Sequence, residues 1–415
     1  MALSRIPMPL LPAPPSWFPG HMMKFTKQLP TFLARTDVVL EIRDSRLPLT
    51  SINRTLEGAL RKWRLERGWD PNNPGKRLFA GQACEHLVIL NKRDLVPQWG
   101  VEPFKRAMAK KFPHQQILFT SWHRPRGIRT LNEILVILPA TDIAKQHPHA
   151  LELNVLVIGM PNVGKSTLLN TLRHMGIKGA TSKAFQTSAN PGMTQALSTR
   201  LKLSLDPPIY AYDSPGVMLP YLGRGEEGAE RGVKLALIAG IKEGLYDMEA
   251  LAAYLLYRLN VLNPISPAYL HLLPPGSQPT ADLYEFLTQL GQRMGMIKKR
   301  AEVDLARAAV YFVRWWREEG GLLAAKPASQ YSPSLDEPLV EGWGFDFQWE
   351  CRADELERRR QEPDAFFEAK MEQCIDDYLD MTSREEREEK NVSPTQVKKR
   401  HMMEEKMKRR LKHKR

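Results

Sequence analysis

Gly159-Met-Pro-Asn-Val-Gly-Lys-Ser166 is the stretch of sequence that decides the fold. It follows an apolar run at residues 153–158 and precedes Thr167–Leu172, which is predicted to form the first turns of a helix. A strand, a glycine loop and a helix in this order are the context in which G-x-x-x-x-G-K-S forms a phosphate-binding P-loop. A chance match in a glycine turn is the alternative, and the flanking strand and helix argue against it.

The residue types of this loop suit a bound nucleotide. Gly159 and Gly164 allow the backbone to turn tightly around a phosphate, and the N–H groups of the loop and the helix N-terminus present a positive dipole to it. Lys165 can reach the β- and γ-phosphate oxygens, and the Ser166 hydroxyl can bind Mg²⁺. The candidate nucleotide-binding residues of the loop are Asn162, Val163, Gly164, Lys165, Ser166 and Thr167.

A second motif stands earlier in the chain, after the apolar run His86–Leu90, which is predicted to be a buried strand. This motif, Asn91-Lys-Arg-Asp94, matches the Asn-Lys-x-Asp pattern with which GTPases read guanine. Asp94 can accept hydrogen bonds from N1–H and the 2-amino group of guanine, whereas adenine would leave the carboxylate unpaired. Asn91 would tie this loop to the P-loop, and the stem of Lys92 can cover the face of the base. The motif therefore disfavours an ATPase.

A third segment would complete the base site. The strand predicted at Gln116–Phe119 ends in Thr120-Ser-Trp122, where a GTPase places the loop whose backbone touches guanine O6. Thr120 and Ser121 are the candidates for this contact. Trp122 departs from the small or basic residue that is more common there.

Two further motifs are candidates for the switches that sense the γ-phosphate. Ala189-Asn-Pro-Gly-Met-Thr194 lies about 30 residues past the P-loop, where switch I is expected, and Thr194 would close on Mg²⁺ when GTP is bound. The predicted strand Ile209–Tyr212 then leads into Asp213-Ser-Pro-Gly216, the candidate switch II. Asp213 would hold Mg²⁺ through water, and the Gly216 N–H would sense the γ-phosphate. An ordinary turn is the alternative for this last motif, and its spacing from the other motifs favours the switch.

The group that positions the attacking water is not evident from these motifs. Ras-like enzymes carry a glutamine after the switch II glycine, but this chain has Val217 there. His21 lies beside a Pro-Gly turn in Trp17–Lys24, and its ordinary pKa of about 6.5 makes it a candidate proton or water handler. A plain loop histidine is the alternative.

The order of the motifs is base-reading loop, P-loop, then switch II, which is a circular permutation of the usual GTPase order. In this order the chain resembles the circularly permuted GTPases of the YlqF/RbgA group, and specifically the mitochondrial members (the Mtg family) that act in large-ribosomal-subunit assembly. The resemblance covers about residues 17–320. The matching segments are Phe18-Pro-Gly-His-Met22, Asp44-Ser-Arg46 with Pro48, Asn91–Asp94, Gly159–Ser166, Asn190–Thr194 and Asp213–Gly216.

The resemblance carries its own expectations. It implies an α/β P-loop GTPase fold, a mostly parallel sheet flanked by helices, followed by a C-terminal all-α domain that contacts ribosomal RNA. It implies a role in GTP hydrolysis for His21 and a potassium ion at Asn162 in place of an arginine finger, and it makes Val217 a family trait. The departures from the family are the Glu66–Gln82 loop, Trp122 and the long C-terminal part.

Composition predicts four segments. Residues 1–16 hold five prolines and are expected to be a disordered tail, in which cleavable targeting is an alternative. Residues 17–240 would form the GTPase domain and 241–320 the helical RNA-contacting domain. Residues 321–415 would hold an irregular segment, a charged helix at 350–380 and a basic tail. Helical spacing is found at 226–241, 247–259, 282–294 and 302–316.

The charge distribution indicates an anionic partner. The net charge is +13, and residues 398–415 hold ten Lys or Arg against two Glu. This density favours RNA phosphate, with anionic lipid as the competing partner. Three cysteines without metal-ligand spacing fit a reducing compartment, and no apolar run reaches the roughly 20 residues that span a bilayer.

Together, the motifs and the resemblance predict a GTP-hydrolysing switch that binds the maturing large subunit of the mitochondrial ribosome and its rRNA and is released as GDP forms. We expect a monomer in the mitochondrial matrix, with peripheral contact with the anionic inner membrane as an option. Mg²⁺ and K⁺ are the expected cofactors, and intrinsic turnover should be low. The rival hypothesis is an RNA- or membrane-binding scaffold whose nucleotide pocket is structural.

Overall fold

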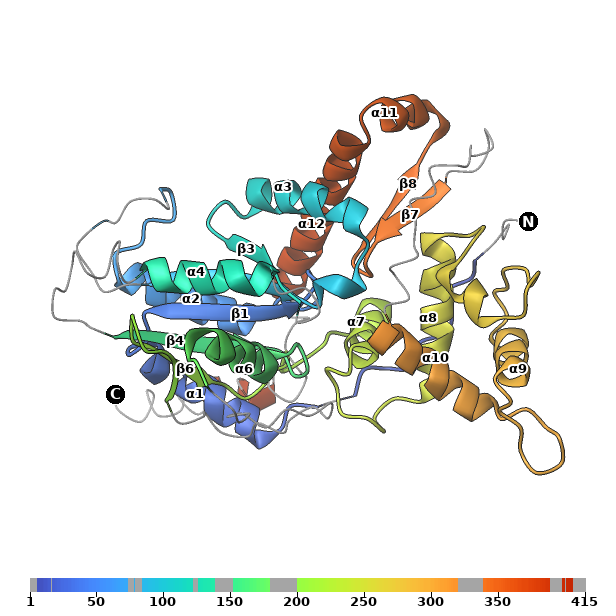
Figure 1. The fold of residues 1–415 in the computed structure, drawn as a ribbon, viewed down its shortest axis with the longest axis horizontal. Helices are drawn as coiled ribbons and strands as arrows, with labels where there is room; N and C mark the ends of the chain where they lie inside the picture. Colours follow the sequence, from blue (N-terminus) through green and yellow to red (C-terminus); the bar gives the residue numbers. More distant parts are fainter. Residues whose placement is uncertain are drawn as a thin grey trace.

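A six-stranded sheet forms the centre of the first part of the chain (Figure 1). The computed structural model describes residues 6–15, 17–73, 78, 84–121, 126–138, 152–179, 200–319, 339–388, 398–399 and 401–405. The strand order is β3-β2-β1-β4-β6-β5, and only β5 runs antiparallel to its neighbour. The strands are β1 (Val38–Asp44), β2 (Glu85–Asn91), β3 (Gln116–Phe119), β4 (Leu153–Gly159), β5 (Leu201–Ser204) and β6 (Ile209–Asp213).

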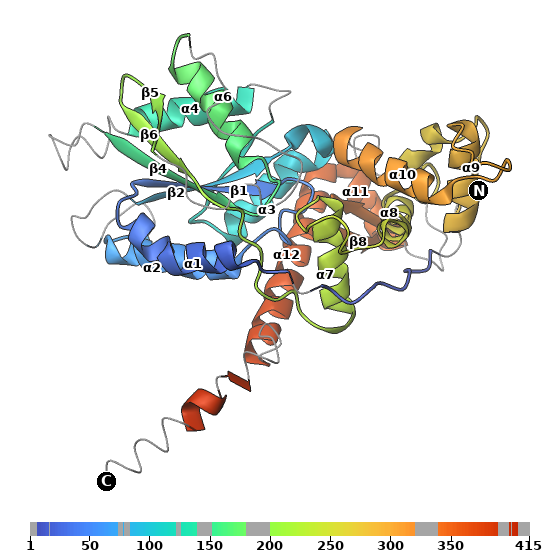
Figure 2. The same cartoon turned by 90° about the horizontal axis from the view of Figure 1, so that it is seen from below.

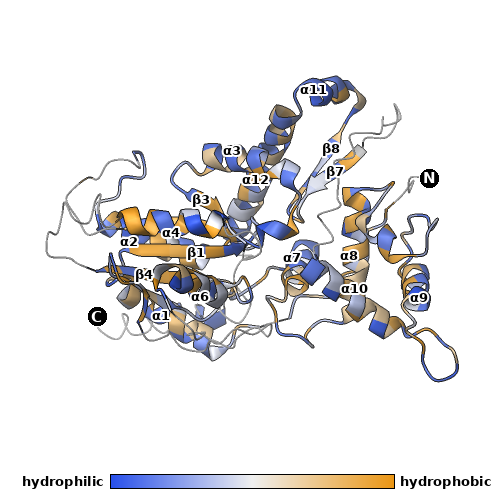
Figure 3. Ribbon diagram, in the orientation of Figure 1, coloured by the Kyte–Doolittle hydropathy of each residue, from blue (hydrophilic) through white to orange (hydrophobic). Residues whose placement is uncertain are grey.

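Helices cover both faces of this sheet (Figure 2). α1 (Gly20–Leu33) and α2 (Arg54–Glu66) lie on one face, and α4 (Arg126–Leu138) and α6 (Lys165–Gly176) lie on the other. The central strands are therefore covered on both sides, and every residue of β1 is buried. Such strands are rich in apolar residues, which Figure 3 shows in β1 and β4, and β1 also buries an ion pair between Glu41 and Arg43.

The topology brings the motifs to one edge of the sheet. The chain passes outward from β1 through β2 to β3, then returns to β4 on the other side of β1. The carboxyl ends of these parallel strands meet at one edge, and the crevice between β1 and β4 is the place where open α/β sheets bind ligands. β4 carries the P-loop at this end.

The helices that follow switch II form the second part of the molecule (Figure 1). The four helices predicted there are present as α7 (Gly225–Leu237), α8 (Met248–Leu262), α9 (Leu283–Arg293) and α10 (Leu305–Glu319). Their side chains belong to the same hydrophobic cluster as one face of the sheet, so apolar packing is continuous between the two parts. The mostly parallel sheet flanked by helices, with a helical region after it, is the predicted fold class. The shorter 3₁₀ turns are η1 (Arg93–Leu95), η2 (Gln98–Gly100), η4 (Ala268–Leu272) and η5 (Ala353–Glu355).

The C-terminal part departs from the sequence prediction. Residues 320–338 of the segment expected to be irregular lie outside the described residues, but the rest is an antiparallel hairpin, β7 (Leu339–Trp343) and β8 (Phe347–Cys351). Trp343 of the hairpin stacks on Phe104 of α3 (Val101–Lys111) and donates from Nε1 to the Pro97 carbonyl at 3.0 Å. The burial that makes this hairpin stable is supplied by residues about 240 positions earlier, so the local pattern could not predict it.

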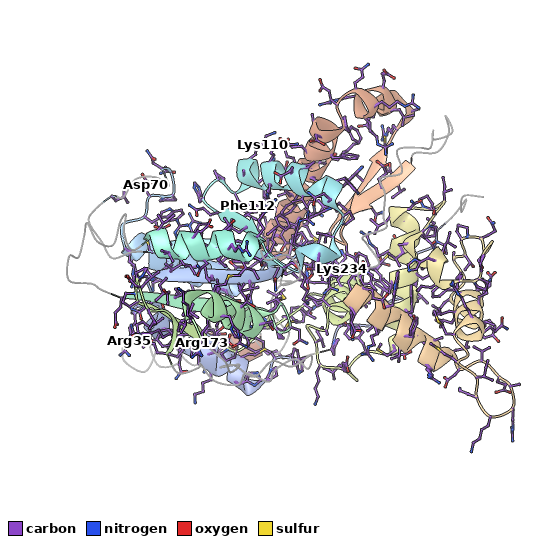
Figure 4. The ribbon with its side chains drawn as sticks, in the orientation of Figure 1. Arg35, Asp70, Lys110, Phe112, Arg173 and Lys234 are labelled. Atoms are coloured by element: carbon purple, nitrogen blue, oxygen red, sulfur yellow. The ribbon has the colours of Figure 1, made fainter. Side chains whose placement is uncertain are left out.

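The predicted charged helix is two helices, α11 (Leu356–Gln361) and α12 (Pro363–Arg387). A proline at the first position of α12 marks the break. α12 runs back along α3, where Lys110 (Figure 4) lies 2.5 Å from Glu368 and 2.6 Å from Glu372. These pairs are exposed and contribute little each.

Near its end α12 joins both parts of the molecule through one buried carboxylate. Glu385 lies 3.2 Å from Arg54 of α2 and 2.9 Å from Arg231 of α7, and 5% of its surface is exposed. The apolar contacts of α12 with α3 and these ion pairs together fix it across the GTPase part.

Apolar side chains of the N-terminal segment contact the core. Leu11, within the tail predicted to be disordered, packs against the main hydrophobic cluster, as do Trp17 and Phe18. Within the described part of the chain, none of the helices combines the length and the apolar character needed to traverse a bilayer.

Candidate nucleotide-binding site

The P-loop has the predicted strand–loop–helix geometry. Its glycines have backbone conformations that would be strained in other residues. Gly159 has φ +146°, and a Cβ there would lie 2.2 Å from the Ile42 carbonyl oxygen of the neighbouring strand. Gly164 precedes the first residue of α6 with φ +96°. Asn162, between them, also has a positive φ, of 56°. The loop is therefore held in the tight conformation that exposes backbone N–H groups to a phosphate.

Lys165 lies folded back over the loop. Its ammonium donates to the carbonyls of Met160 at 2.8 Å and Gly159 at 3.4 Å. Burial lowers the pKa of Lys165 to about 8, although the nearby Asp213 carboxylate acts in the opposite direction. A phosphate beside this amine would restore its charge, since an adjacent anion favours the protonated form.

The two oxygens predicted to hold Mg²⁺ lie together. Ser166 Oγ donates to Asp213 Oδ2 at 2.5 Å, and burial raises the pKa of Asp213. These side chains fit a magnesium ion, because Mg²⁺ takes oxygen ligands and is usually held by one or two protein oxygens together with phosphates and water. Thr194, the predicted third ligand, lies outside the described residues, and so does Trp122. Within the described part of the chain, no cluster of three or more His, Cys, Asp or Glu side chains offers another metal site.

Hydrogen bonds join the base-reading loop to the P-loop. Asn91 Nδ2 donates to the Val163 carbonyl at 2.8 Å, which is the contact expected from the motif. Thr120 Oγ1 donates to Asn91 Oδ1 at 3.1 Å, and the Arg93 N–H donates to the Thr120 carbonyl at 3.0 Å. Three loops from β2, β3 and β4 are thus fixed relative to one another. Thr120 and Ser121 are each 1% exposed.

The carboxylate of Asp94 is placed where it can accept hydrogen bonds from a ligand. Its Oδ1 is buried and accepts no hydrogen bond from any residue that the structure describes. A buried acceptor without a partner costs about 1–3 kcal/mol. The N1–H and 2-amino groups of guanine would supply the missing donors.

Switch II lies against the P-loop. A Cβ on Gly216 would lie 2.7 Å from the Pro161 backbone, and the Val217 N–H donates to the Gly159 carbonyl at 3.1 Å. Val217 itself is buried among side chains of α1 and the sheet. Only a glycine therefore fits at position 216 in this close approach, which agrees with the sequence motif.

His21 occupies the first turn of α1 rather than the loop suggested by the Pro-Gly turn. Burial lowers its pKa below the ordinary value, so the imidazole is neutral at pH 7. Its Nε2 is buried and has no hydrogen-bond partner in the described part of the chain. The Met218 N–H donates to Sδ of Met22, the residue after His21, at 3.5 Å. The start of α1 therefore lies beside the residues that follow Gly216.

Asn162 makes a contact that the motif did not predict. Its Nδ2 donates to the Ala239 carbonyl at 2.8 Å, in the turn after α7. A potassium ion would need the amide oxygen of Asn162, so the cation role remains a prediction. The contact itself connects the P-loop to the helical part.

Sequence reasoning also gave no role to the residues at the end of β1. Lys92 has φ +59°, and its ammonium lies 3.0 Å from Asp44 Oδ2. Asp44 is fully buried and forms an ion pair with Arg46. Two signals were available: Asp44-Ser-Arg46 is one of the segments that match the family, and Asp44 ends a buried parallel strand next to the one that carries Asn91.

Comparisons with known proteins identify the family of the chain. Residues 154–257 match the family described as 50S ribosome-binding GTPase. Mitochondrial ribosome-associated GTPase 1 of Xenopus tropicalis is 32% identical over 285 residues, which cover 68% of this chain and 81% of that protein. Mitochondrial GTPase 1 of Schizosaccharomyces japonicus is 30% identical over 305 residues, which cover 73% of this chain and 87% of that protein.

Among solved structures, GNP-bound YlqF from T. maritima is similar with a TM-score of 0.40 and 19% identity, covering 72% of this chain and 94% of that one. The identities to the curated relatives extend over most of their length and confirm the family predicted from the motifs. The chain belongs to the family of GTPases that includes mitochondrial ribosome-associated GTPase 1 and mitochondrial GTPase 1.

Proposed function

We propose that this GTPase is an assembly factor that binds the maturing large subunit of the mitochondrial ribosome and leaves after GTP hydrolysis. The observation that carries the proposal is the hydrogen bond from Asn162 of the P-loop to Ala239, where the chain leaves α7 for the helical part. Through this contact, a change at the phosphates can reach the helices at 241–320 that would contact rRNA. The relatives named mitochondrial and ribosome-associated support the choice of partner.

The site residues divide the chemistry among them. Lys165 and the P-loop backbone would hold the phosphates, while Asn91, Lys92, Asp94, Thr120 and Ser121 would hold guanine. Ser166, Thr194 and Asp213 would hold Mg²⁺, which would offset the negative charge of the phosphates. His21, neutral at pH 7, can hold the attacking water or accept its proton. The oxygen of Asn162 would bind K⁺, which would take the place of an arginine finger.

The nucleotide would act by ordering two segments of the chain. GTP would order switch I at Thr194 and switch II at Gly216, and so set the position of the helices after α7. Docking on the subunit would complete the hydrolytic site, and GDP would release the factor. The basic residues 398–415 would bind rRNA phosphate, with anionic inner-membrane lipid as the alternative. The protein would act as a monomer in the mitochondrial matrix.

The test measures GTP turnover by the protein alone and with immature large mitochondrial subunits, in potassium and in sodium buffers. We expect low turnover alone, stimulation by subunits and a higher rate in potassium. Equal rates under all four conditions would refute the proposal.

Two variants separate the switch from a scaffold with a structural nucleotide pocket. Lys165→Ala should abolish turnover and nucleotide-dependent subunit binding. Lys62→Ala removes a lysine from α2 whose side chain is 78% exposed, and it should change neither property. If folded Lys165→Ala still supports subunit assembly, the scaffold explanation is correct.

A further inference from the structure

The carboxyl end of β1 holds a buried cluster of two cations around one carboxylate. Asp44 Oδ1 accepts from Arg46 Nε at 2.9 Å and from the Arg46 backbone N–H at 3.0 Å. Asp44 Oδ2 accepts from Arg46 Nη2 at 2.8 Å and from Lys92 Nζ at 3.0 Å. Asp44 is 0% exposed and Arg46 is 1% exposed. These partners hold the pKa of Asp44 far below its ordinary range.

Stability alone is a weak reason for such a cluster. Removing charged groups from water costs several kcal/mol per ion, and apolar residues of the same size often stabilise a core as well or better. Burial lowers the pKa of Lys92, although the Asp44 carboxylate acts in the opposite direction. A role in holding neighbouring residues in position therefore explains the cluster better than stability does.

On one side, the cluster reaches the base-reading loop. Lys92 lies between Asn91, which is fixed to the P-loop, and the residues leading to Asp94. With its ammonium held by Asp44, the stem of Lys92 is fixed across the loop rather than free in solvent. That stem is the part expected to cover the face of guanine.

On the other side, the cluster reaches the end of α10. The Arg46 guanidinium lies over the Trp316 ring at 4.6 Å, and its Nη1 donates to the Arg317 carbonyl at 3.4 Å. Trp316 is fully buried. A planar guanidinium that chelates a carboxylate and stacks on an aromatic ring is a role that lysine does not fill.

The contacts continue to the phosphate side of the site. Arg317 Nε and Nη2 donate to the carbonyls of Leu237 at 2.8 Å and Ala236 at 2.9 Å, at the end of α7. Two residues later Ala239 accepts from Asn162 of the P-loop. The base-reading loop and the P-loop thus both connect to the end of α10, one through Arg46 and the other through α7.

We propose that Asp44 and Arg46 are positioning residues that hold Lys92 in place for guanine and join the base-reading loop to the end of α10. The inference rests on the guanine site of the proposed function. Because coupling between two sites is reciprocal, a bound base stabilises the α10 contact, and the α10 contact strengthens base binding.

The first test uses Arg46→Lys, which keeps the charge but loses the two-pronged contact and the stack. GDP affinity should fall about tenfold, which corresponds to about 1.4 kcal/mol. Affinity for inorganic tripolyphosphate, which needs only the P-loop, should change less than about twofold. Equal losses for both ligands, or no loss for GDP, would overturn the inference. Should Arg46→Lys fail to fold, Asp44→Asn gives the same comparison.

Arg43→Lys is the matched control. Arg43 lies on β1, three residues before Arg46, and is 1% exposed; its guanidinium lies 2.7 Å from Glu41 and 3.2 Å from Glu57. It should lower the unfolding temperature as Arg46→Lys does and leave GDP affinity unchanged. If Arg43→Lys weakens GDP binding equally, the effect of Arg46 is only structural.

Two measurements test the route of the effect. In a Lys92→Ala background, Arg46→Lys should cause no further loss of GDP affinity, whereas an independent additional loss contradicts a role through Lys92. GDP should slow amide hydrogen exchange in α10 of the wild type but not of Arg46→Lys, and undiminished protection in the variant contradicts the coupling. A wild type that shows no preference for GDP over ADP would refute the guanine site itself.

Discussion

The docking of the C-terminal hairpin depends on Asp346 at its turn, and Asp346→Ala tests this dependence. Asp346 Oδ2 accepts from the N–H groups of Leu49 and Thr50, each at 2.8 Å, and Oδ1 accepts from Thr50 Oγ1 at 2.5 Å. The side chain is 3% exposed. Leu49 and Thr50 follow β1, so the turn attaches β7 and β8 to the GTPase part.

The expected loss of stability follows from the groups left behind. Each buried backbone N–H without an acceptor costs about 1–3 kcal/mol. Two such groups predict that Asp346→Ala loses about 4 kcal/mol in the free energy of unfolding. The hydroxyl of Thr50 can turn to another acceptor, so we add nothing for it.

Urea unfolding followed by far-ultraviolet circular dichroism measures this loss. Asp364→Ala is the control, because Asp364 belongs to the same C-terminal part but is 69% exposed and has one ion pair, 3.7 Å from Arg106. It should change stability by less than about 1 kcal/mol. A loss below about 1 kcal/mol for Asp346→Ala, or equal losses for both variants, would show that the turn is not what holds the hairpin.

Three further predictions concern the nucleotide site. Asp94→Asn should shift the preference from guanine to xanthine nucleotides, and competition between GDP and XDP measures the shift; an unchanged preference would exclude Asp94 from base reading. Because the pKa of Lys165 is lowered to about 8, the folded protein binds fewer protons than the unfolded chain above that pH, so stability should rise between about pH 8 and 10. Lys165→Met should flatten this rise in thermal unfolding curves, and an identical slope would contradict the buried charge. His21→Ala should lower kcat for GTP by about 100-fold or more without changing GDP affinity, and a parallel loss of both would indicate a structural role.

The sequence predicted the strands, the motifs at their ends and the helices after switch II because each depends on a local pattern. A buried parallel strand is a continuous apolar run, and the residue after it lies at the ligand edge, so Asn91 and Asp213 could be placed without coordinates. The fold class followed from the same signals.

The remaining features depend on partners distant in sequence. Trp343 is buried because Phe104 and Pro97 lie beneath it, and no pattern near residue 343 contains that information. The contact of Lys92 with Asp44 requires the register of two neighbouring strands, in which Asp44 lies opposite Asn91. The helical start of α1 at His21 was concealed by the Pro-Gly turn before it.

The shared carboxylate of Glu385 limits how the two parts of the molecule can move. Arg54 belongs to α2 and Arg231 to α7, so a rotation that separates these helices must break one of the two ion pairs. The carboxylate left behind would be buried with half of its partners, a state that costs about 3–5 kcal/mol when a buried pair is broken outright. The arrangement in which both pairs are formed is therefore favoured over one in which α2 and α7 move apart.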